Sequence, residues 1–228
     1  MKYFFLICAR GGSKGLKNKN LRKINKVPLI GWSIKIAKKF SKIGKIVVNS
    51  DSKRILDYAK KAGANILINR PKNLAKDTSK EIDVWKHSIK KIDKIYKMRP
   101  EAIISVPPTS PCRSAIDIKR CIQKFETKKY DVVICVTPSY RNPYFNIVEI
   151  IKNDFLKICI DTKRYSNRQA APKTYDITTV CYIADINYIK KTKNILKGKI
   201  GYIVVPQERS IDIDTITDLK VASILKRK

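Results

Sequence analysis

The sequence predicts an α/β fold: a doubly wound, mostly parallel sheet with a small β-rich excursion. Two observations support this prediction. Over the first 136 residues, short apolar runs alternate with stretches of helical periodicity; this alternation is typical of a parallel sheet with helices on both faces. It stops at Thr137, and residues 139–176 contain alternating apolar patches instead. The length, 228 residues, fits one α/β domain.

The first strand is predicted at residues 3–9, which are nearly all apolar and are followed at once by a glycine pair. Such a short continuous run is typical of a strand buried on both faces. Four more apolar runs predict strands at residues 45–49, 65–69, 102–106 and 131–136. Helical spacing or helix-end signals predict helices between these strands, at residues 28–40, 52–62, 78–97 and 114–125.

The second part of the chain is predicted to leave the main sheet and then rejoin it. Two apolar patches, at residues 145–151 and 155–160, are separated by Lys152-Asn-Asp154 and predict a β-hairpin within residues 139–176. Strands are then expected at residues 177–184 and 202–205, and a final helix at residues 215–225.

The net charge of +31 first suggests a nucleic-acid partner. Lysine greatly outnumbers arginine, however, and is spread along the whole chain, as the composition of an AT-rich genome produces. A nucleic-acid-binding protein is therefore the less favoured alternative.

No apolar stretch approaches 18 residues, so we expect no transmembrane helix. We also expect no signal peptide, and hence a cytoplasmic protein. Four cysteines in apolar runs are expected to be buried and reduced, namely Cys8, Cys135, Cys159 and Cys181. His87 is expected to be a surface or packing residue.

A glycine-rich basic loop follows the first strand. Glycines let the backbone approach a ligand closely, and successive N–H groups in such a turn attract anions. Arg10, Lys14 and Lys19 add positive charge. Because ligands bind beyond the carboxyl ends of parallel strands, we expect this loop to lie beside those carrying Asp51, Arg70 and Arg113. The pattern predicts a phosphate site or, alternatively, an ordinary turn.

Asp212 and Asp214 alternate with Ile211 and Ile213 near the end of the chain. In an extended strand, residues two apart project from the same face. Two neighbouring carboxylates are typical ligands of Mg²⁺, which takes one or two carboxylates together with phosphate oxygens and water. The alternatives are solvated aspartates at a strand end, or a helix cap at Asp214.

Several strings, in order along nearly the whole chain, resemble motifs of the acylneuraminate cytidylyltransferases, which are the CMP-sialic acid synthetases and their relatives. The loop string is Ala9-Arg-Gly-Gly-Ser-Lys-Gly-Leu16 with Lys19-Asn20, and the metal string is Ser210-Ile-Asp-Ile-Asp-Thr215. The others are Arg70-Pro71 with Leu74-Ala75 and Asp77-Thr78, then Pro108-Thr-Ser-Pro-Cys-Arg113, and Arg168-Gln169.

The resemblance implies a single cytidylyltransferase domain over residues 1–228 that transfers CMP from CTP to the 2-hydroxyl of a nonulosonic acid. It implies Mg²⁺ on Asp212 and Asp214, and catalytic roles for Arg10, Lys19 and Asp212. The general base is either Asp212 or a metal-bound water. The nucleotide would be bound by Arg10, Gly11, Gly12, Ser13, Lys14, Lys19, Asn20 and Arg70.

The resemblance also implies a homodimer in which the excursion of one protomer, at residues 139–176, borders the sugar pocket of the other. Arg168, Gln169 and Tyr182 would bind the acidic sugar. Pro107 and Thr178 depart from the sialic acid enzymes, so the acceptor is expected to be another nonulosonic acid, of legionaminic or pseudaminic type. The remaining alternative is a sugar nucleotidyltransferase that uses UTP, GTP or dTTP, or that uses CTP with an octulosonate.

Overall fold

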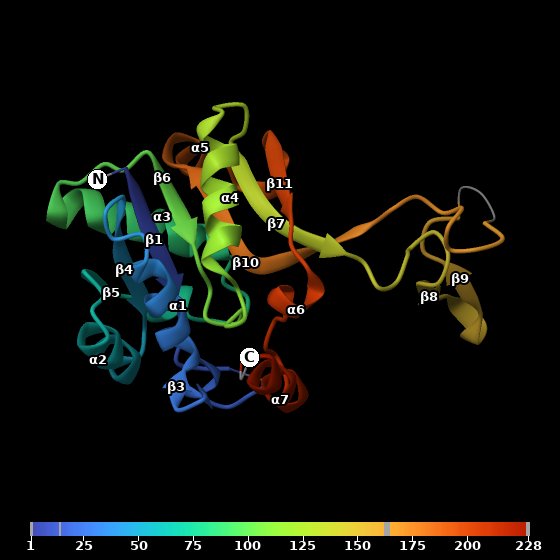
Figure 1. Ribbon diagram of the computed structural model, residues 1–228, viewed down its shortest axis with the longest axis horizontal. Helices are drawn as coiled ribbons and strands as arrows, with labels where there is room; N and C mark the ends of the chain where they lie inside the picture. The colour runs from blue at the N-terminus through green and yellow to red at the C-terminus, as the bar shows by residue number, and fades with distance from the viewer. Residues whose placement is uncertain (1, 14, 162–164, 227–228) are drawn as a thin grey trace.

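The computed structural model describes residues 2–13, 15–161 and 165–226. A seven-stranded sheet forms its centre (Figure 1). β10 is antiparallel to both of its neighbours, and the other pairings are parallel, so the predicted fold class is confirmed. In spatial order the strands are β11 (Ile200–Val204), β7 (Val132–Pro138), β10 (Tyr175–Asp185), β6 (Ala102–Ser105), β1 (Tyr3–Cys8), β4 (Gly44–Ser50) and β5 (Ile66–Asn69).

Helices cover both faces of the sheet because alternate residues of each central strand are buried on opposite sides. Phe5 and Ile7 of β1 pack in the core with Ile34 and other residues of three helices, α1 (Leu29–Lys38), α2 (Lys53–Lys61) and α4 (Ala115–Glu126). Phe4 and Leu6 pack in the opposite core with residues of α3 (Glu81–Tyr96) and α5 (Ile186–Lys191).

β1 lies at the point where the strand order reverses. Its register pairs Tyr3 with Gly44 of β4 on one side and with Ala102 of β6 on the other. A crevice forms at such a switch point beyond the carboxyl ends of the strands, and ligands bind there. The loop after Cys8 therefore begins where a binding site is expected.

A small subdomain packs beside this loop. It contains a two-stranded hairpin, β2 (Lys23–Ile24) with β3 (Val27–Pro28), and the last helix, α7 (Ile216–Leu225). Leu16, Ile24 and Ile213 form its core together with Leu29 and Ala222. The end of the chain is thereby fastened to the loop after β1, as Figure 1 shows near the C-terminus.

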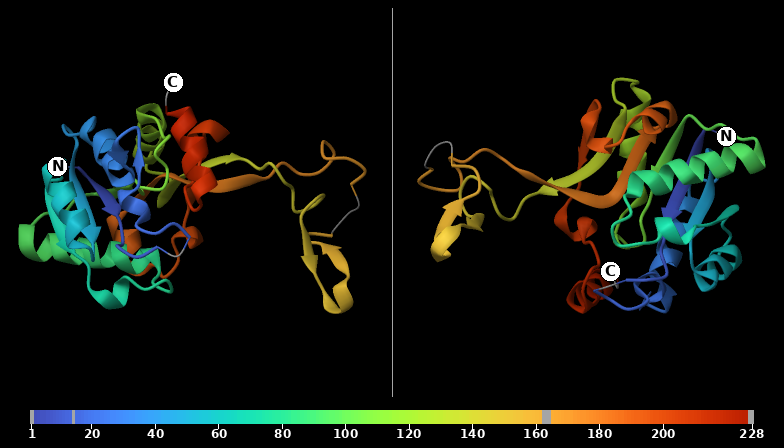
Figure 2. Two further views of the ribbon diagram at one scale, coloured as in Figure 1. Left: turned by 90° about the horizontal axis from the view of Figure 1, so that it is seen from below. Right: turned by 180° about the vertical axis from the view of Figure 1, so that it is seen from behind.

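In the connection between β7 and β10, residues 139–161 and 165–174 project from the sheet (Figure 2). They contain a short hairpin, β8 (Val148–Ile150) paired with β9 (Leu156–Ile158). The strands are shorter than the sequence predicts, because residues 145–147 instead bond back to Asn142 in a turn.

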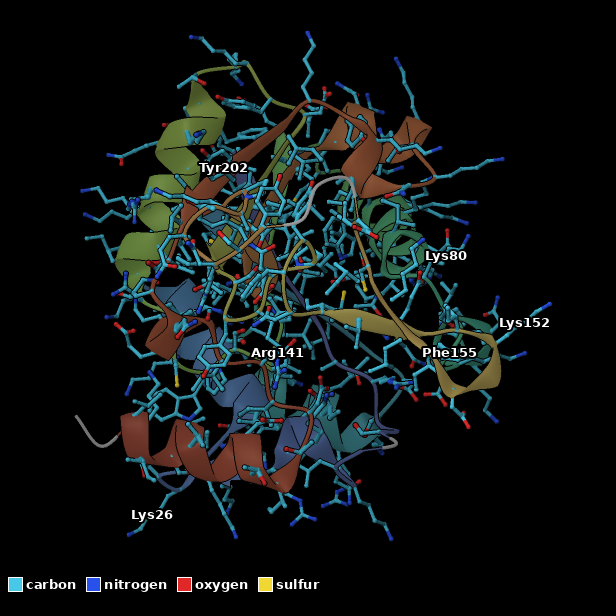
Figure 3. The ribbon with its side chains drawn as sticks, turned by 90° about the vertical axis from the view of Figure 1, so that its right-hand side faces the viewer. Lys26, Lys80, Arg141, Lys152, Phe155 and Tyr202 are labelled. Atoms are coloured by element: carbon cyan, nitrogen blue, oxygen red, sulfur yellow. The ribbon has the colours of Figure 1, made fainter. Side chains whose placement is uncertain are left out.

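Apolar side chains of this hairpin are exposed in the single chain: Ile150 is 78% accessible, Phe155 66% and Leu156 64%. Figure 3 shows Phe155 with Lys152 on this hairpin, and many side chains that end in nitrogen around the outline of the molecule in this view. The prediction that Cys159 is buried is wrong, because its apolar run belongs to this hairpin rather than to the core.

None of the helices in the described ranges combines the length and apolar character needed to cross a membrane.

Candidate functional site

Three hydrogen bonds fix the conformation of the loop that follows the carboxyl end of β1. The Gly11 N–H donates to Asp51 Oδ1 at 2.8 Å, and the buried Asn20 amide donates to the Arg10 carbonyl at 2.8 Å. Arg22 Nε donates to the Lys17 carbonyl at 3.1 Å. The Asp51 and Arg22 side chains lie outside the cavity lining, whereas Arg10, Ser13, Lys19 and Asn20 line the cavity.

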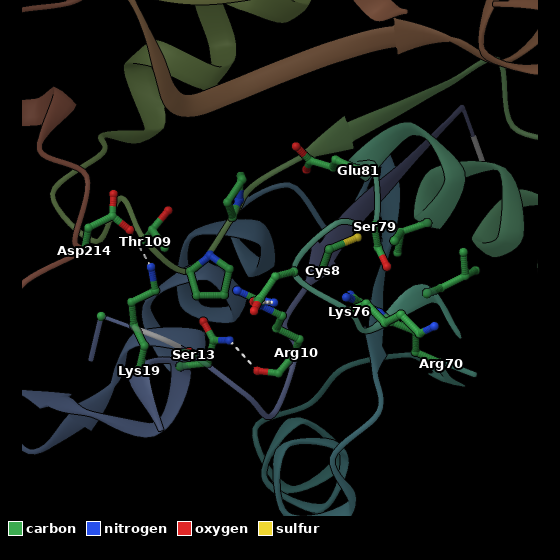
Figure 4. A pocket seen from close by; sticks show the side chains of 17 residues that line it. Cys8, Arg10, Ser13, Lys19, Arg70, Lys76, Ser79, Glu81, Thr109 and Asp214 are labelled. Atoms are coloured by element: carbon green, nitrogen blue, oxygen red, sulfur yellow. Dashed lines mark hydrogen bonds and ion pairs between the residues drawn. The ribbon is translucent and has the colours of Figure 1, made fainter. Parts of the chain in front are cut away.

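The cavity has a volume of about 450 Å³, within the range of small-molecule sites. Two ion pairs form between residues of its lining, and Figure 4 shows the one between Lys19 and Asp214. Arg10 binds Asp77 on the loop before α3, and Lys19 Nζ lies 2.7 Å from Asp214 Oδ1. The carboxylates hold the two cations in the cavity, where an anionic ligand could contact them.

Arg70 lies on the opposite wall and is rigidly positioned. Only 7% of it is exposed, and its guanidinium donates to Asn49 Oδ1 at 2.8 Å and to the Asn49 carbonyl at 2.9 Å. Asn49 in turn donates to Ser88 at 2.7 Å and contacts His87 at 3.3 Å, so His87 is a packing residue. A buried, doubly bonded guanidinium is suited to a contact of fixed geometry.

The segment carrying Asp212 and Asp214 is fixed on three sides. The Ile213 N–H donates to the Thr109 carbonyl at 2.9 Å, and the Ile213 side chain is fully buried. A capping box between Thr215 and Asp218 follows it at the start of α7. The segment is not part of a strand, contrary to the extended strand assumed from its alternation. The two carboxylates nevertheless flank one buried residue and are both exposed.

A partly buried ion pair lies just before this segment in the chain. Arg209 of α6 (Gln207–Ser210) donates to both oxygens of Asp117 on α4, at 2.9 to 3.3 Å. Asp117 is fully buried, and it also accepts from the N–H of Ser114 at 3.0 Å. The carboxylate therefore joins the helix cap of α4 to the turn that precedes Asp212.

The donor set fits a hard cation such as Mg²⁺. Asp214 borders the cavity beside Lys19, and Asp212 lies close enough for its charge to act on Glu81 and Tyr182. In the described residues, no group of three or more His, Cys, Asp and Glu side chains could hold a metal ion by itself. Mg²⁺ is often held by one or two carboxylates together with phosphate oxygens of the substrate, so the paired aspartates suit that mode.

The loop that carries Arg113 lies at the predicted edge, since Pro107, Pro108 and Thr109 line the cavity, but the Arg113 side chain itself has a structural position. Only 3% of it is exposed, and it binds Ser33 at 2.8 Å, the Pro107 carbonyl and the Thr179 carbonyl at 3.1 Å. Burial lowers the pKa of its guanidinium to about 10. It fastens the loop of residues 107–113 to β10. Burial also raises the pKa of Cys8 in the cavity to about 12, so that thiol stays protonated.

The predicted site residues fall into three places. Arg10, Ser13, Lys19, Asn20, Arg70 and Asp214 line the main cavity. Gly11 and Gly12 form the backbone beside it, and Asp212 lies near its edge. Lys14 lies outside the described residues.

The predicted sugar residues do not meet in one chain. Arg168 and Gln169 line a separate cavity of about 600 Å³ on the projecting connection, where Arg168 donates to the Ser139 carbonyl at 2.8 Å. Tyr182 lies on β10 in a small recess beside α3.

Sequence reasoning missed Glu81, which lines the main cavity from the first turn of α3. It also missed Ile195 and Leu196, which line the recess beside Tyr182. An acidic residue at a helix start is commonplace, so its signal was available but unspecific.

The fold is that of nucleotidyltransferases. The solved structure of CMP:2-keto-3-deoxy-manno-octonic acid synthetase complexed with CTP superposes with a TM-score of 0.71, covering 100% of this chain and 99% of that chain at 15% identity. Residues 4–222 match the family model described as cytidylyltransferase. The chain therefore belongs to the cytidylyltransferase family and is a nucleotidyltransferase, as the sequence resemblance predicts.

Similar proteins are known from Campylobacter. The CMP-N,N'-diacetyllegionaminic acid synthase of Campylobacter jejuni is 35% identical over 219 residues, which cover 96% of this chain and 92% of that protein. The post-translational flagellin modification protein B of Campylobacter coli is 32% identical with the same coverage. The pseudaminic acid cytidylyltransferase of Campylobacter jejuni is 28% identical over 229 residues, 99% of this chain and 96% of that protein.

Proposed function

We propose that the protein transfers CMP from CTP to the anomeric 2-hydroxyl of a nonulosonic acid of legionaminic type. The Lys19–Asp214 ion pair is the observation that supports this proposal most strongly. It places a cation suited to binding phosphate beside a carboxylate suited to binding a metal ion, at the switch point of the sheet. The names of the similar Campylobacter proteins support the acceptor class.

In this reaction the acceptor oxygen bonds to the α-phosphorus of CTP, and the bond from that phosphorus to the bridging oxygen of pyrophosphate breaks. Arg10 and Lys19 stabilise the negative charge that builds on the phosphate oxygens. Arg70 contacts the cytosine ring of CTP from its fixed position. The proton of the hydroxyl passes to the Asp212 carboxylate or to a water molecule.

Asp212 and Asp214 would hold Mg²⁺, which supplies positive charge to the phosphates when bound. The two substrates are both anionic, so alignment by these fixed groups is a large part of catalysis. We propose that the reaction takes place in the cytoplasm, where CTP is available and the six free cysteines stay reduced.

The test is pyrophosphate release with CTP, UTP, GTP and dTTP, each against legionaminic, pseudaminic and sialic acids and an octulosonate. Turnover with CTP and a legionaminic-type acid supports the proposal. Turnover with another nucleotide, or with the octulosonate alone, would refute it. Salt-sensitive oligonucleotide binding without any turnover would favour the nucleic-acid alternative.

We further propose a homodimer in which Arg168 of one protomer reaches the acceptor at the Tyr182 recess of the other. The exposed apolar residues of the β8–β9 hairpin need a covering surface, and a second copy supplies one.

Mixing two inactive variants, Arg168→Ala and Asp214→Asn, tests this arrangement. In a mixed dimer, one site receives an intact Asp214 and the partner subunit's Arg168, so an equal mixture should regain roughly a quarter of wild-type activity. If both residues serve a site within one chain, no mixed dimer has an intact site. No recovery after verified subunit exchange would therefore count against it.

A further inference from the structure

Glu81 stands at the boundary between two cavities. It lines the main cavity with Arg10 and Arg70, and it also lines the recess that contains Tyr182. Among the described residues, no other side chain lines both. A ligand that extends from the nucleotide site into the recess must therefore pass this carboxylate.

The recess is small and mostly apolar. Its volume is about 120 Å³, well below the roughly 300–1,000 Å³ of a whole small-molecule site, so it suits one substituent rather than a whole ligand. The Glu81 carboxylate and the Tyr182 hydroxyl are polar groups in its walls. The other lining side chains are aliphatic or aromatic: Ile82, Trp85, Ile177, Ile195 and Leu196.

Contacts within the recess hold the Glu81 carboxylate in place. Trp85 Nε1 donates to Glu81 Oε1 at 3.2 Å, and the Trp85 ring packs edge-on against Tyr182 with centroids 6.2 Å apart. A carboxylate has about four acceptor positions, so the indole leaves capacity for a ligand. Within 4 Å, Glu81 forms no ion pair with a residue that the structure describes.

The charge of Glu81 restricts what it can bind. Desolvation raises the pKa of Glu81 and the charge of Asp212 raises it further, whereas Trp85, Arg70 and the neighbouring Ser105 hydroxyl oppose the rise. An ionised carboxylate repels phosphate and sugar carboxylate groups, so it needs an N–H or O–H donor. A bare hydroxyl would satisfy the carboxylate and leave the apolar walls uncovered, whereas an acylamino group offers both an N–H and an apolar end.

We propose that Glu81 is a specificity-determining residue that accepts a hydrogen bond from the N–H of an acylamino substituent on the acceptor sugar, while the acyl group enters the recess. This inference rests on the proposed function, because it assigns the acceptor to the Tyr182 side of the cavity.

Steady-state kinetics with two acceptors test the assignment. One is N,N'-diacetyllegionaminic acid, and the other is a nonulosonic acid with hydroxyls in place of acylamino groups. Glu81→Ala should raise KM for the first acceptor about tenfold to a hundredfold, as expected for a lost charge-assisted hydrogen bond. Glu81→Gln keeps an acceptor oxygen without the charge and should raise it about three- to tenfold. KM for CTP and for the hydroxyl acceptor should change much less.

Asp83→Asn is the matched control. It removes one negative charge from the same first turn of α3 but lies outside both cavities, so it should leave the ratio of the two acceptor KM values unchanged. An equal ratio in wild type and Glu81→Ala would overturn the inference, as would an altered ratio in Asp83→Asn.

Tryptophan emission separates this inference from the proposed function. In a Trp32→Phe background, Trp85 is the remaining tryptophan, and it lines the recess. Titration with each acceptor then reports occupancy of the recess without turnover. If no nonulosonic acid releases pyrophosphate, the proposed function fails; weaker binding of the acylamino acceptor to Glu81→Ala would still support the Glu81 assignment, and unchanged binding would refute it.

Discussion

At Gly15 the loop after β1 comes close to the segment that carries Asp212 and Asp214, which we call the metal segment after its proposed role. A Cβ atom at Gly15 would lie 2.7 Å from the carbonyl oxygen of Asp214, closer than carbon and oxygen can approach without displacement. The obstacle is backbone, and both sides are held: Asp214 by the α7 cap and the loop by Asn20. Gly15→Ala must therefore push the Asp214 segment away from Lys19.

The cost of such overpacking is about 1–3 kcal/mol. For a chain of this size that corresponds to a fall in Tm of roughly 3–9 °C, at about 3 °C per kcal/mol. Thermal unfolding followed by circular dichroism measures it. Gly12→Ala is the matched control for stability, because a Cβ there meets nothing within 4 Å. Equal Tm values for the two variants would refute the predicted close approach of loop and metal segment.

Three further predictions concern single side chains. Asp214→Asn should keep the fold and lose most activity at ordinary Mg²⁺, with partial rescue at high Mg²⁺; near wild-type turnover at low Mg²⁺ would exclude a metal role. Arg168→Lys should raise KM for the sugar roughly ten- to a hundredfold and leave KM for CTP nearly unchanged, since lysine cannot form two parallel bonds to a carboxylate; equal effects on both substrates would contradict it. Arg209→Gln leaves the buried Asp117 short of donors and should cost about 1.5–3 kcal/mol by chemical denaturation, towards the lower end because Arg209 is 30% exposed; a neutral effect would mean that the pair does not stabilise the fold.

The sequence was sufficient for most of the fold because periodicity reports burial directly. The predicted strands at residues 3–9 and 45–49 agree with β1 and β4 to within one residue at each end. α3 was predicted from residue 78 but begins at Glu81. Residues before it wrap the cavity instead, through the Arg10–Asp77 pair and a Ser79 hydroxyl bond to the Asn73 carbonyl at 3.1 Å.

The β2–β3 hairpin was missed because its turn has a weak signal. Asn25 and Lys26 both have positive φ, at 49° and 67°. This turn geometry is most readily recognised from Asn-Gly or Asp-Gly, and lysine in its second position hides it. Each strand is only two residues long, so no alternation was available either.

The site was predictable where its residues come in short strings and hidden where contacts span the chain. The loop of residues 10–20 and the two aspartates were found as local patterns. Asp117 and Arg209 are 92 residues apart and share no motif, yet their ion pair fixes the turn that precedes the metal segment. Glu81 acquires its position only when α3 packs against β10, since one carboxylate at a helix start carries no specific signal.

The projecting connection gives the reason why a single chain presents only part of the predicted acceptor site. Arg168 and Gln169 line a cavity beyond the edge of the sheet, whereas Tyr182 and Glu81 lie beside α3. The same connection exposes Ile150, Phe155 and Leu156. Large apolar side chains are stabilised by burial, at about 25 cal/mol per Å² removed from water. We therefore expect the burial of the hairpin against a second chain and the delivery of Arg168 to the acceptor to be one event, so that a variant that weakens the dimer also raises KM for the sugar.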